Sequence, residues 1–410
     1  MSSVRRHRAV LVALTASTLL LAACGSTTKT ASTSPKQPIT IGVSISLSGM
    51  FSGDGKADLQ GYQLWADQVN TNGGLLGRPV KLIVKNDDSS TQQTLTNYQT
   101  LIGTDHVDLV VGPFSSLLTI PAEQIAKRFG YVLLAPAGGA PAVFQQHYNG
   151  YADVEPAAVV NELVSLGDMI KTMPASQRPR TVAYATSNNP FTEPQLPPLQ
   201  QELTSAGVHT VYYQVFQDQT PDLTPEALAI VNTHADAVVL GTTSVPQVQA
   251  FVQTFIQQHY SPKLIVATSG PDQGSTFSSA IGAANTEGFL VPNSWTPTLK
   301  TFENSQFVTA YLHTYGGKAV DIPSDAAQAF SVGQVLQQLV TTTHSIKNSV
   351  LITALHGHTY KTVQGDMSWN SDGVPSGNGM FLMQWQNGGT KIVWPLSYAQ
   401  SRFEYPKPTW

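Results

Sequence analysis

The sequence has one cysteine, few charged residues and no long apolar run after its first residues. A single cysteine in 410 residues excludes an internal disulfide, so the folded state must be stabilised by burial of apolar side chains. Charged residues make up 12% of the chain, and the formal charge is −4 at pH 7. Binding to nucleic acid depends on lysine and arginine that neutralise phosphates, so this composition does not favour it. No later stretch approaches the roughly 20 consecutive apolar residues that a membrane-spanning helix needs.

Short motifs of several enzyme classes are also missing. No G-x-S-x-G elbow is present, so the usual signature of an α/β hydrolase is absent. No G-x-x-x-x-G-K-[ST] loop is present, which excludes a P-loop ATPase. His356 and His358 form a close pair without a nearby cysteine or third ligand, so we predict no metal site. We expect neither an enzyme nor a bound cofactor.

The single cysteine, Cys24, lies directly after a segment typical of secreted proteins. Three arginines precede an apolar stretch at 9–20, and Leu-Ala-Ala comes immediately before the cysteine. This segment resembles the lipobox of bacterial lipoproteins, which implies removal of residues 1–23, lipid on the Cys24 thiol and an anchor at the outer face of the cell membrane. The alternatives are a plain signal peptide with an incidental cysteine or an N-terminal membrane helix. Residues 24–38 are rich in Ser and Thr and are expected to form a flexible tether.

Beyond the tether, short apolar runs alternate with amphipathic stretches. Strands are predicted at 39–46, 80–85, 107–112, 131–135, 181–186, 211–216, 237–241, 264–268 and 288–291. Helices are predicted between them, for example at 57–70, 91–102, 120–129, 159–171 and 247–259. This alternation is typical of parallel sheets covered by helices on both faces. Because a single core stops growing near roughly 250–300 residues, the fold class is α/β with two lobes. A long helix at 326–343 and strands at 380–386 and 391–394 complete the pattern.

Several short motifs, in order along the chain, carry a family resemblance. They are Ser48-Gly49, Gly61 in a helix, VNTNGGLLG at 69–77, Asp87-Asp88, GPFSS at 112–116, APA at 135–137, Glu287-Gly288, GDMSW at 365–369 and Asp372-Gly373. In order and spacing they resemble the Leu/Ile/Val-binding proteins, which are type I periplasmic solute-binding proteins of ABC importers. The resemblance spans 39–394.

This resemblance implies a fold of two Rossmann-like, doubly wound lobes joined by three crossovers, with a ligand cleft between the lobes. We place the crossovers near Val154, Glu287 and Val363. Residues 39–154 and 288–362 would then form the first lobe, and residues 155–287 and 363–410 would form the second.

The first lobe supplies candidate ligand-binding residues at the carboxyl ends of its strands, where open α/β sheets place their sites. Ser115 and Ser116 follow a strand and open a helix, whose free N–H groups and partial positive charge suit a carboxylate. The resemblance places the ligand carboxylate at Ser116, although a serine here also serves as a helix cap. By the same resemblance, the Ala137 carbonyl faces the ligand amine, and Gly139 stands where amino-acid binders tend to have threonine.

The second lobe supplies further candidates. Phe191 corresponds to a cleft aromatic of the family, with core packing as an equal alternative. The family acid that pairs with the ligand ammonium has no counterpart after the strand at 237–241, where Pro246 is the best match. A free amino acid is therefore a less favoured ligand, unless Asp272 substitutes, although aspartate in a Gly-Pro-Asp loop is more often a turn former. Trp295 is a candidate cleft wall, with hinge packing as the alternative.

These observations predict a lipid-anchored extracytoplasmic solute-binding protein of an ABC importer. It would capture a small ligand that bears a carboxylate or amide, either branched-chain amino acid-like or an aromatic or aliphatic acid, by closure of the cleft. Its partners would be the ligand, an ABC permease and the membrane through the lipid, and the protein is expected to be a monomer. The alternatives are a sensory receptor of the same fold that feeds a signalling partner, and an anchored enzyme.

Overall fold

The computed structural model describes residues 36–155, 162–377 and 379–410. The chain divides into a compact unit, Gln37–Trp410, and the residues before it, Met1–Lys36. The predicted signal segment at 1–23, the lipidation site Cys24 and nearly all of the tether therefore lie outside the described residues. In the part of the chain that is described, no helix has the length and apolar character needed to cross a bilayer.

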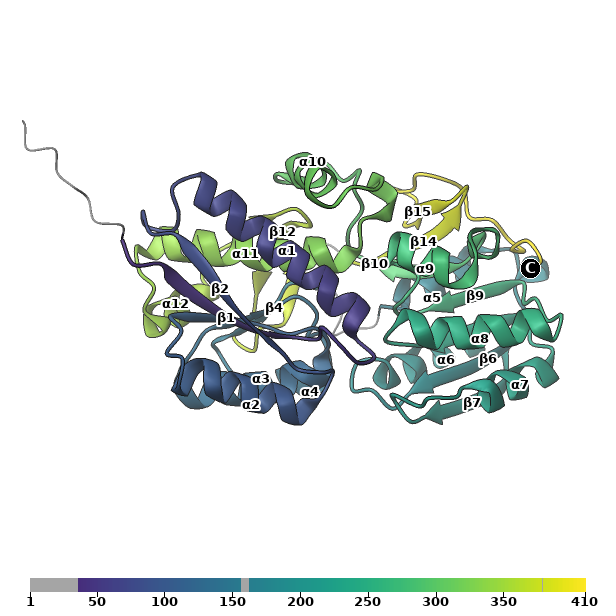
Figure 1. The fold of residues 1–410 in the computed structure, drawn as a ribbon. Helices are drawn as coiled ribbons and strands as arrows, with labels where there is room; N and C mark the ends of the chain where they lie inside the picture. The colour runs from purple at the N-terminus through teal and green to yellow at the C-terminus, as the bar shows by residue number, and fades with distance from the viewer. Residues whose placement is uncertain (1–35, 156–161, 378) are drawn as a thin grey trace, which may run out of the picture. The chain divides into compact units, whose positions relative to one another are not determined.

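The first lobe is built on a five-stranded parallel sheet (Figure 1). The strand order is β2-β1-β3-β4-β5, with β1 (Ile39–Ile45), β2 (Val80–Asn86), β3 (Leu109–Val111), β4 (Leu133–Ala135) and β5 (Tyr151–Asp153). Strand β1 places an isoleucine or valine at every second position, and all four of these side chains belong to one core cluster. Alternate residues of a strand face the same side of the sheet, so this sequence buries one face of β1 continuously.

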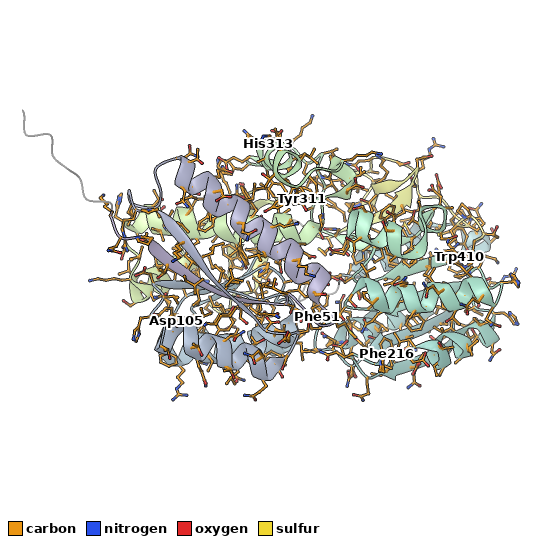
Figure 2. All side chains as sticks on the ribbon, viewed as in Figure 1. Phe51, Asp105, Phe216, Tyr311, His313 and Trp410 are labelled. Atoms are coloured by element: carbon orange, nitrogen blue, oxygen red, sulfur yellow. The ribbon has the colours of Figure 1, made fainter. Side chains whose placement is uncertain are left out.

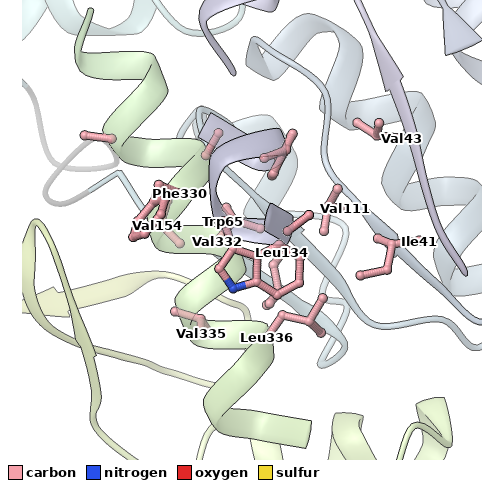
Figure 3. Packing of buried hydrophobic residues seen from close by; sticks show 14 of the residues in the cluster. Ile41, Val43, Trp65, Val111, Leu134, Val154, Phe330, Val332, Val335 and Leu336 are labelled. Carbon is pink, nitrogen blue, oxygen red and sulfur yellow. The ribbon is translucent and has the colours of Figure 1, made fainter. Parts of the chain in front are cut away.

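Helices cover both faces of this sheet. One face packs against α1 (Ser52–Thr71), α11 (Ser324–Thr343) and α12 (Asn348–Leu355), and α10 (Asn304–Tyr315) adds Phe307 and Tyr311 to the same core cluster. The other packs against α2 (Thr91–Gly103), α3 (Ser116–Phe129) and the short α4 (Pro141–Phe144). Figure 3 shows the first face, where Trp65 of α1 lies among Val332 and Leu336 of α11.

The second lobe is built on a seven-stranded sheet in the order β15-β14-β10-β9-β8-β6-β7. Its parallel strands are β6 (Thr181–Ser187), β7 (His209–Phe216), β8 (Ala237–Gly241), β9 (Leu264–Ala267) and β10 (Leu290–Asn293). Strands β14 (Phe381–Gln386) and β15 (Gly389–Trp394) are antiparallel additions. One face packs against α5 (Val164–Thr172) and α6 (Leu196–Ser205), and the other against α7 (Thr224–Thr233), α8 (Val245–Gln257) and α9 (Gly274–Ile281).

Shorter elements complete the two lobes. A three-stranded antiparallel sheet contains β11 (Tyr360–Thr362), β12 (Gly365–Trp369) and β13 (Pro375–Gly377). Short 3-10 helices occur at η1 (Ala175–Gln177), η2 (Glu193–Gln195), η3 (Ala283–Thr286) and η4 (Ala319–Asp321). The prediction of two doubly wound α/β lobes is confirmed.

Two predicted lobe boundaries differ from the structure. Strand β10 was expected to open the second part of the first lobe, but it pairs with β9 and β14 in the sheet of the second lobe. The chain re-enters the first lobe only at Trp295, which joins that lobe's core. The third crossover was expected near Val363, yet Met367 and Trp369 of β12 still pack into the first-lobe core. The chain leaves that lobe between β13 and β14. The sequence did not show this, because an apolar run predicts a strand but not the sheet that the strand joins.

The C-terminal residues pack onto the second lobe. The backbone N–H of Lys407 donates to the Lys263 carbonyl over 2.9 Å, and the indole N–H of Trp410 donates to the Tyr260 carbonyl over 2.7 Å. The Lys407 ammonium lies 3.5 Å from the centre of the Trp410 ring, a favourable cation–π contact. Figure 2 labels Trp410 at this end of the molecule. The Pro-rich end is therefore part of the folded second lobe.

Candidate ligand-binding site

A pocket lies where the strands of both sheets end. It encloses about 530 Å³ of empty space, part of it open to solvent. The first lobe contributes residues that follow β3, β4 and β5 and residues at the start of α11, and the second lobe contributes residues that follow β6, β8 and β9. The position at the carboxyl ends of the strands is the one where open α/β sheets place their small-molecule sites.

The N-terminus of α3 forms one wall of the pocket. Phe114, Ser115 and Ser116 all line it, and neither serine caps the helix with its side chain. The Ser116 hydroxyl accepts a hydrogen bond from the Ala140 N–H at 3.0 Å, whereas the buried Ser115 hydroxyl has no hydrogen-bond partner. An uncapped helix end with a free hydroxyl can receive a carboxylate or another polar group.

The turn after β4 contributes one of its two predicted residues. Ala137 lines the pocket, while Gly139 is buried in the same turn and is not among the lining residues. The turn is held in place by the Gly138 N–H, which donates to Oδ1 of Asp153 over 3.0 Å. A side chain at position 138 would collide with the Tyr151 hydroxyl, so glycine is required there by space.

The two predicted aromatic residues occupy different places. Phe191 lines the pocket, and its backbone N–H donates to Oδ1 of Asn189 at 2.9 Å. Trp295 does not line this pocket, because its ring is buried against Phe307 and its indole N–H donates to Oδ1 of Asn304 over 2.7 Å. Trp295 therefore packs inside the first lobe, beside a smaller adjoining cavity that it lines together with Asp272.

The loop after β8 carries no acid into the pocket. Thr243 lines the pocket, and its N–H donates to Oε1 of Gln247 over 2.8 Å. Pro246 lies in the first turn of α8 and lines a separate surface groove instead. The sequence left open that Asp272 substitutes for this acid, and Asp272 does line the pocket together with carboxyl groups from other elements.

Among the residues that the structure describes, four carboxyl groups line the pocket, and no lysine, arginine or histidine does. Glu155 follows β5, Glu162 precedes α5, Asp272 follows β9 and Asp325 lies in the first turn of α11. Of these, only Asp272 was singled out from the sequence. Side chains of one charge sign in a largely buried space favour a ligand of the opposite sign.

Two of these carboxyl groups join the lobes. Oδ2 of Asp272, in the second lobe, accepts a hydrogen bond from the hydroxyl of Ser324 in the first lobe at 2.7 Å. The amide of Gln273 donates to Oδ2 of Asp325 over 2.6 Å, again across the lobes. Gln219 adds a third link, because its amide donates to the Ser89 carbonyl at 3.2 Å. The lobes are thus in direct contact around the pocket, as a closed cleft requires.

Burial raises the pKa of each of these carboxyl groups. Loss of hydration raises the pKa of Glu162 to about 8. Burial likewise raises the pKa of Glu155 well above its usual value, and Glu162 raises it further. For Asp325 burial is again the main cause, followed by repulsion from Asp54, and for Asp272 burial outweighs the hydrogen bond from Ser324. A nearby positive charge would favour ionisation of all four groups.

Two further acids lie on α1 outside the pocket wall. Asp54 and Asp58 are buried, and neither oxygen of Asp58 has a hydrogen-bond partner. Burial raises the pKa of Asp58 well above its usual value, and Asp54 raises it further. These two acids face Asp325, whose pKa both of them raise in turn. The acidic character therefore extends beyond the residues that touch the pocket.

Comparisons with known proteins define the family. Two doubly wound lobes with a pocket at the strand ends are the architecture of type I periplasmic binding proteins, and the periplasmic binding protein family matches residues 38–390. The chain belongs to this family. It is 22% identical over 386 residues to Leu/Ile/Val-binding protein homolog 7 of Brucella suis, covering 86% of this chain and 90% of that protein. It is also 22% identical over 361 residues to the Leu/Ile/Val/Thr-binding protein of Salmonella typhimurium, covering 86% and 92%.

Solved structures share the fold at low sequence identity. A solute-binding protein of an ABC transporter from R. palustris, in complex with benzoate, superimposes with a TM-score of 0.75 at 16% identity, covering 91% of this chain and 97% of that one. The branched-chain amino acid transporter substrate-binding protein LivJ of Streptococcus pneumoniae, in complex with isoleucine, gives a TM-score of 0.71 at 18% identity, covering 91% and 100%. These neighbours are binding proteins rather than enzymes, in agreement with the sequence prediction.

Proposed function

We propose that the protein is the extracytoplasmic solute-binding lipoprotein of an ABC importer. It captures a small ligand between its lobes, directs a carboxylate or amide of that ligand towards Ser115 and Ser116, and presents the closed form to a permease. The observation that carries this proposal is the pocket at the strand ends of both lobes, together with membership of the periplasmic binding protein family. Lipid on Cys24 would keep the protein at the outer face of the membrane.

The arrangement of polar groups supports capture without covalent chemistry. Ser115 offers a buried, unpartnered hydroxyl at an uncapped helix N-terminus, and Thr243 and Asn189 add polar groups from the second lobe. The hydrogen bonds between Asp272 and Ser324 and between Gln273 and Asp325 join the two lobes beside the pocket. Ligand contacts made in the same closed state would shift the hinge equilibrium towards closure.

Binding is tested by thermal shifts of the purified protein after it has been unfolded and refolded to remove any ligand. The panel contains aliphatic amino acids, their deaminated carboxylates, aromatic carboxylates, small amides and basic amino acids. A ligand at ~1,000 times its Kd stabilises the folded form by about 4 kcal/mol, so at least one compound is expected to raise the Tm by several degrees. No shift by any compound, or conversion of a compound into a product, would contradict the proposal.

The role of the α3 N-terminus is tested with Ser115→Ala. A hydrogen bond to a charged group contributes about 1.5–3 kcal/mol, so this variant is expected to weaken the binding of a carboxylate ligand about 10- to 100-fold. Ser349→Ala, at an exposed position of α12, is the matched control and is expected to bind normally. Equal affinity in the two variants would show that the carboxylate does not bind at α3.

A further inference from the structure

We propose that the pocket binds a small ligand with two cationic nitrogen atoms, one beside Glu155 and Glu162 and the other beside Asp272 and Asp325. This inference deepens the proposed function, because it rests on solute binding in the same pocket and names the charge of the solute. The shared chemistry is a pair of ammonium or guanidinium groups on a short aliphatic chain. A basic amino acid provides it together with the carboxylate proposed for Ser115 and Ser116, whereas a diamine provides it without one and would overturn that part of the proposed function.

The first line of argument is the charge of the pocket wall. Four carboxyl groups line the pocket, and lysine, arginine and histidine are absent from its described wall. Burial of an ionised carboxylate without a counter-charge is costly, and a ligand that carries only a carboxylate would add to the negative charge. A ligand with one ammonium and one carboxylate would leave the excess of acids unbalanced. A second cationic nitrogen reduces this excess.

The second line of argument is the set of unpartnered acceptors. Oε2 of Glu162 has no hydrogen-bond partner although Glu162 is only 2% exposed and lines the pocket. Oε1 of Gln328, at 4% exposure, is also unpartnered in the same wall. Buried acceptors need donors, and an ammonium group carries three N–H donors and no acceptor. An organic cation therefore fits both the charge and the hydrogen-bonding capacity of this wall.

The acids of the pocket wall form two neighbouring pairs, and this favours two cationic centres. Glu155 and Glu162 lie close enough for each to shift the pKa of the other. Asp272 and Asp325 are joined through Gln273, whose amide donates to Oδ2 of both, at 3.2 and 2.6 Å. Asp272 is held additionally by the Gly270 N–H over 2.8 Å, so its carboxylate has a fixed orientation. Each pair can accept one cationic nitrogen, with the apolar chain of the ligand between them.

A metal ion is a poor alternative occupant. Across residues 36–155, 162–377 and 379–410, no group of three or more His, Cys, Asp or Glu side chains has the geometry to hold one. Phe114, Phe191 and Met380 also line the pocket, and their apolar surface suits the methylene chain of an organic ligand.

The experiment is isothermal titration of the purified protein with L-lysine, cadaverine, L-norleucine and benzoate. Lysine and norleucine have side chains of similar length, so their difference isolates the second cationic nitrogen. We expect lysine, cadaverine or both to bind about 100-fold more tightly than norleucine and benzoate. Tighter binding of lysine would identify a basic amino acid, and tighter binding of cadaverine would identify a diamine. Norleucine or benzoate binding as tightly as lysine would overturn the inference.

Two variants connect the preference to the acids. Glu162→Gln and Asp272→Asn are each expected to weaken lysine or cadaverine binding at least about 10-fold. Glu123→Gln is the matched control, because Glu123 is a buried acid of α3 that is absent from the pocket wall, and burial raises its pKa to about 8 as well. Its affinity for the same probes is expected to be unchanged, and an equal loss in all three variants would contradict the assignment.

Proton release gives an independent readout. Since a cation favours the ionised form of Glu162, whose pKa burial raises to about 8, binding should release protons that titrations in buffers of different ionisation enthalpy detect. The ionisable groups that face Glu162 are Glu155, Asp153 and Asp272, and each of them is an acid. Cation binding without proton release would contradict this part of the inference. If the wider panel shows binding but no preference for two cationic nitrogens, only this inference fails, whereas no binding at all contradicts the proposed function.

Discussion

The ligand-free protein is expected to lose stability as the pH rises from about 5 to about 8, the reverse of the usual behaviour of carboxylates. Burial raises the pKa of Asp153 to about 7 and that of Glu162 to about 8. It also raises the pKa of Asp58 and Asp325 well above the usual value. In the unfolded chain these groups ionise near pH 4, so between those values the folded state binds more protons than the unfolded state.

The sign of the effect follows from this difference in bound protons. The stabilising contribution is fully present below about pH 4 and is lost as the pH rises through the folded-state pKa values. Each unit of pKa shift corresponds to about 1.4 kcal/mol, so the summed effect is several kcal/mol. We expect the Tm of the ligand-free protein to fall by roughly 10 °C from the lower to the higher pH, as measured by calorimetry.

Asp58 offers the sharpest test of this pH dependence. It faces Asp54 and Tyr62 on its own helix and Asp325 on α11, and both of its oxygens are unpartnered. Asp58→Asn is expected to stabilise the protein at about pH 8 and to flatten the dependence, because a neutral side chain replaces one that must ionise inside the core. Asp67→Asn, at an exposed position of the same helix, is the control. A Tm that rises from pH 5 to 8 in the unaltered protein would contradict the prediction.

The same dependence is expected to change when a dication occupies the pocket. Positive charge beside Glu162 and Asp325 lowers the cost of ionising them, so the bound protein should lose much less stability at the higher pH. The difference between the two curves then measures how strongly the ligand is coupled to the acids. A neutral ligand would raise the Tm by the same amount at the lower and at the higher pH.

The sequence was sufficient to predict the two doubly wound lobes, because that information is local. In β1 the apolar residues alternate, and in α8 they recur at helical spacing, so each element shows which face it buries. The order of the elements then selects parallel sheets. The lobe to which β10 and β12 belong could not be predicted from local sequence patterns. Both have patterns that fit either lobe. The pairing of β10 with β9 and with β14, nearly one hundred residues later, assigns it to the second lobe.

The pocket residues divide in the same way. Ser115, Ser116 and Ala137 follow strands directly, so their place at the sheet edge could be predicted from the βα pattern. Glu155 and Glu162 lie beside a crossover, and Asp325 is at the start of a helix that returns from far along the chain. Their convergence with Asp272 depends on closure of the two lobes, which no local pattern encodes. The position of Glu155 and Glu162 beside a crossover was the one sequence feature that could have pointed to them, since crossovers border the cleft.

Gly61→Ala is expected to destabilise the first lobe by about 3 kcal/mol, because the new methyl group has no space. Helices α1 and α11 cross closely, and a Cβ at position 61 would overlap the backbone carbonyl of Ala326 and crowd the Cβ of Ala329. A backbone carbonyl cannot rotate away as a flexible side chain can, so the helices must separate. Separation would loosen the contact of Trp65 with Val332 and Leu336, which Figure 3 shows at the centre of this core.

Gly53→Ala provides a matched control on the same helix, where a Cβ at position 53 would meet no atom within 4 Å. Alanine is favoured over glycine in a helix by up to about 1 kcal/mol, so this variant is expected to be neutral or slightly more stable. Gly333→Ala, whose Cβ would overlap the Trp65 ring from the other side of the same crossing, should resemble Gly61→Ala. Because both changes separate the same two helices, the double variant should lose less than the sum of the single losses in denaturant unfolding. Equal stability of the Gly53 and Gly61 variants would show that the crossing is not as close as the structure places it, and the position of Asp325 relative to Asp54 and Asp58 would then change as well.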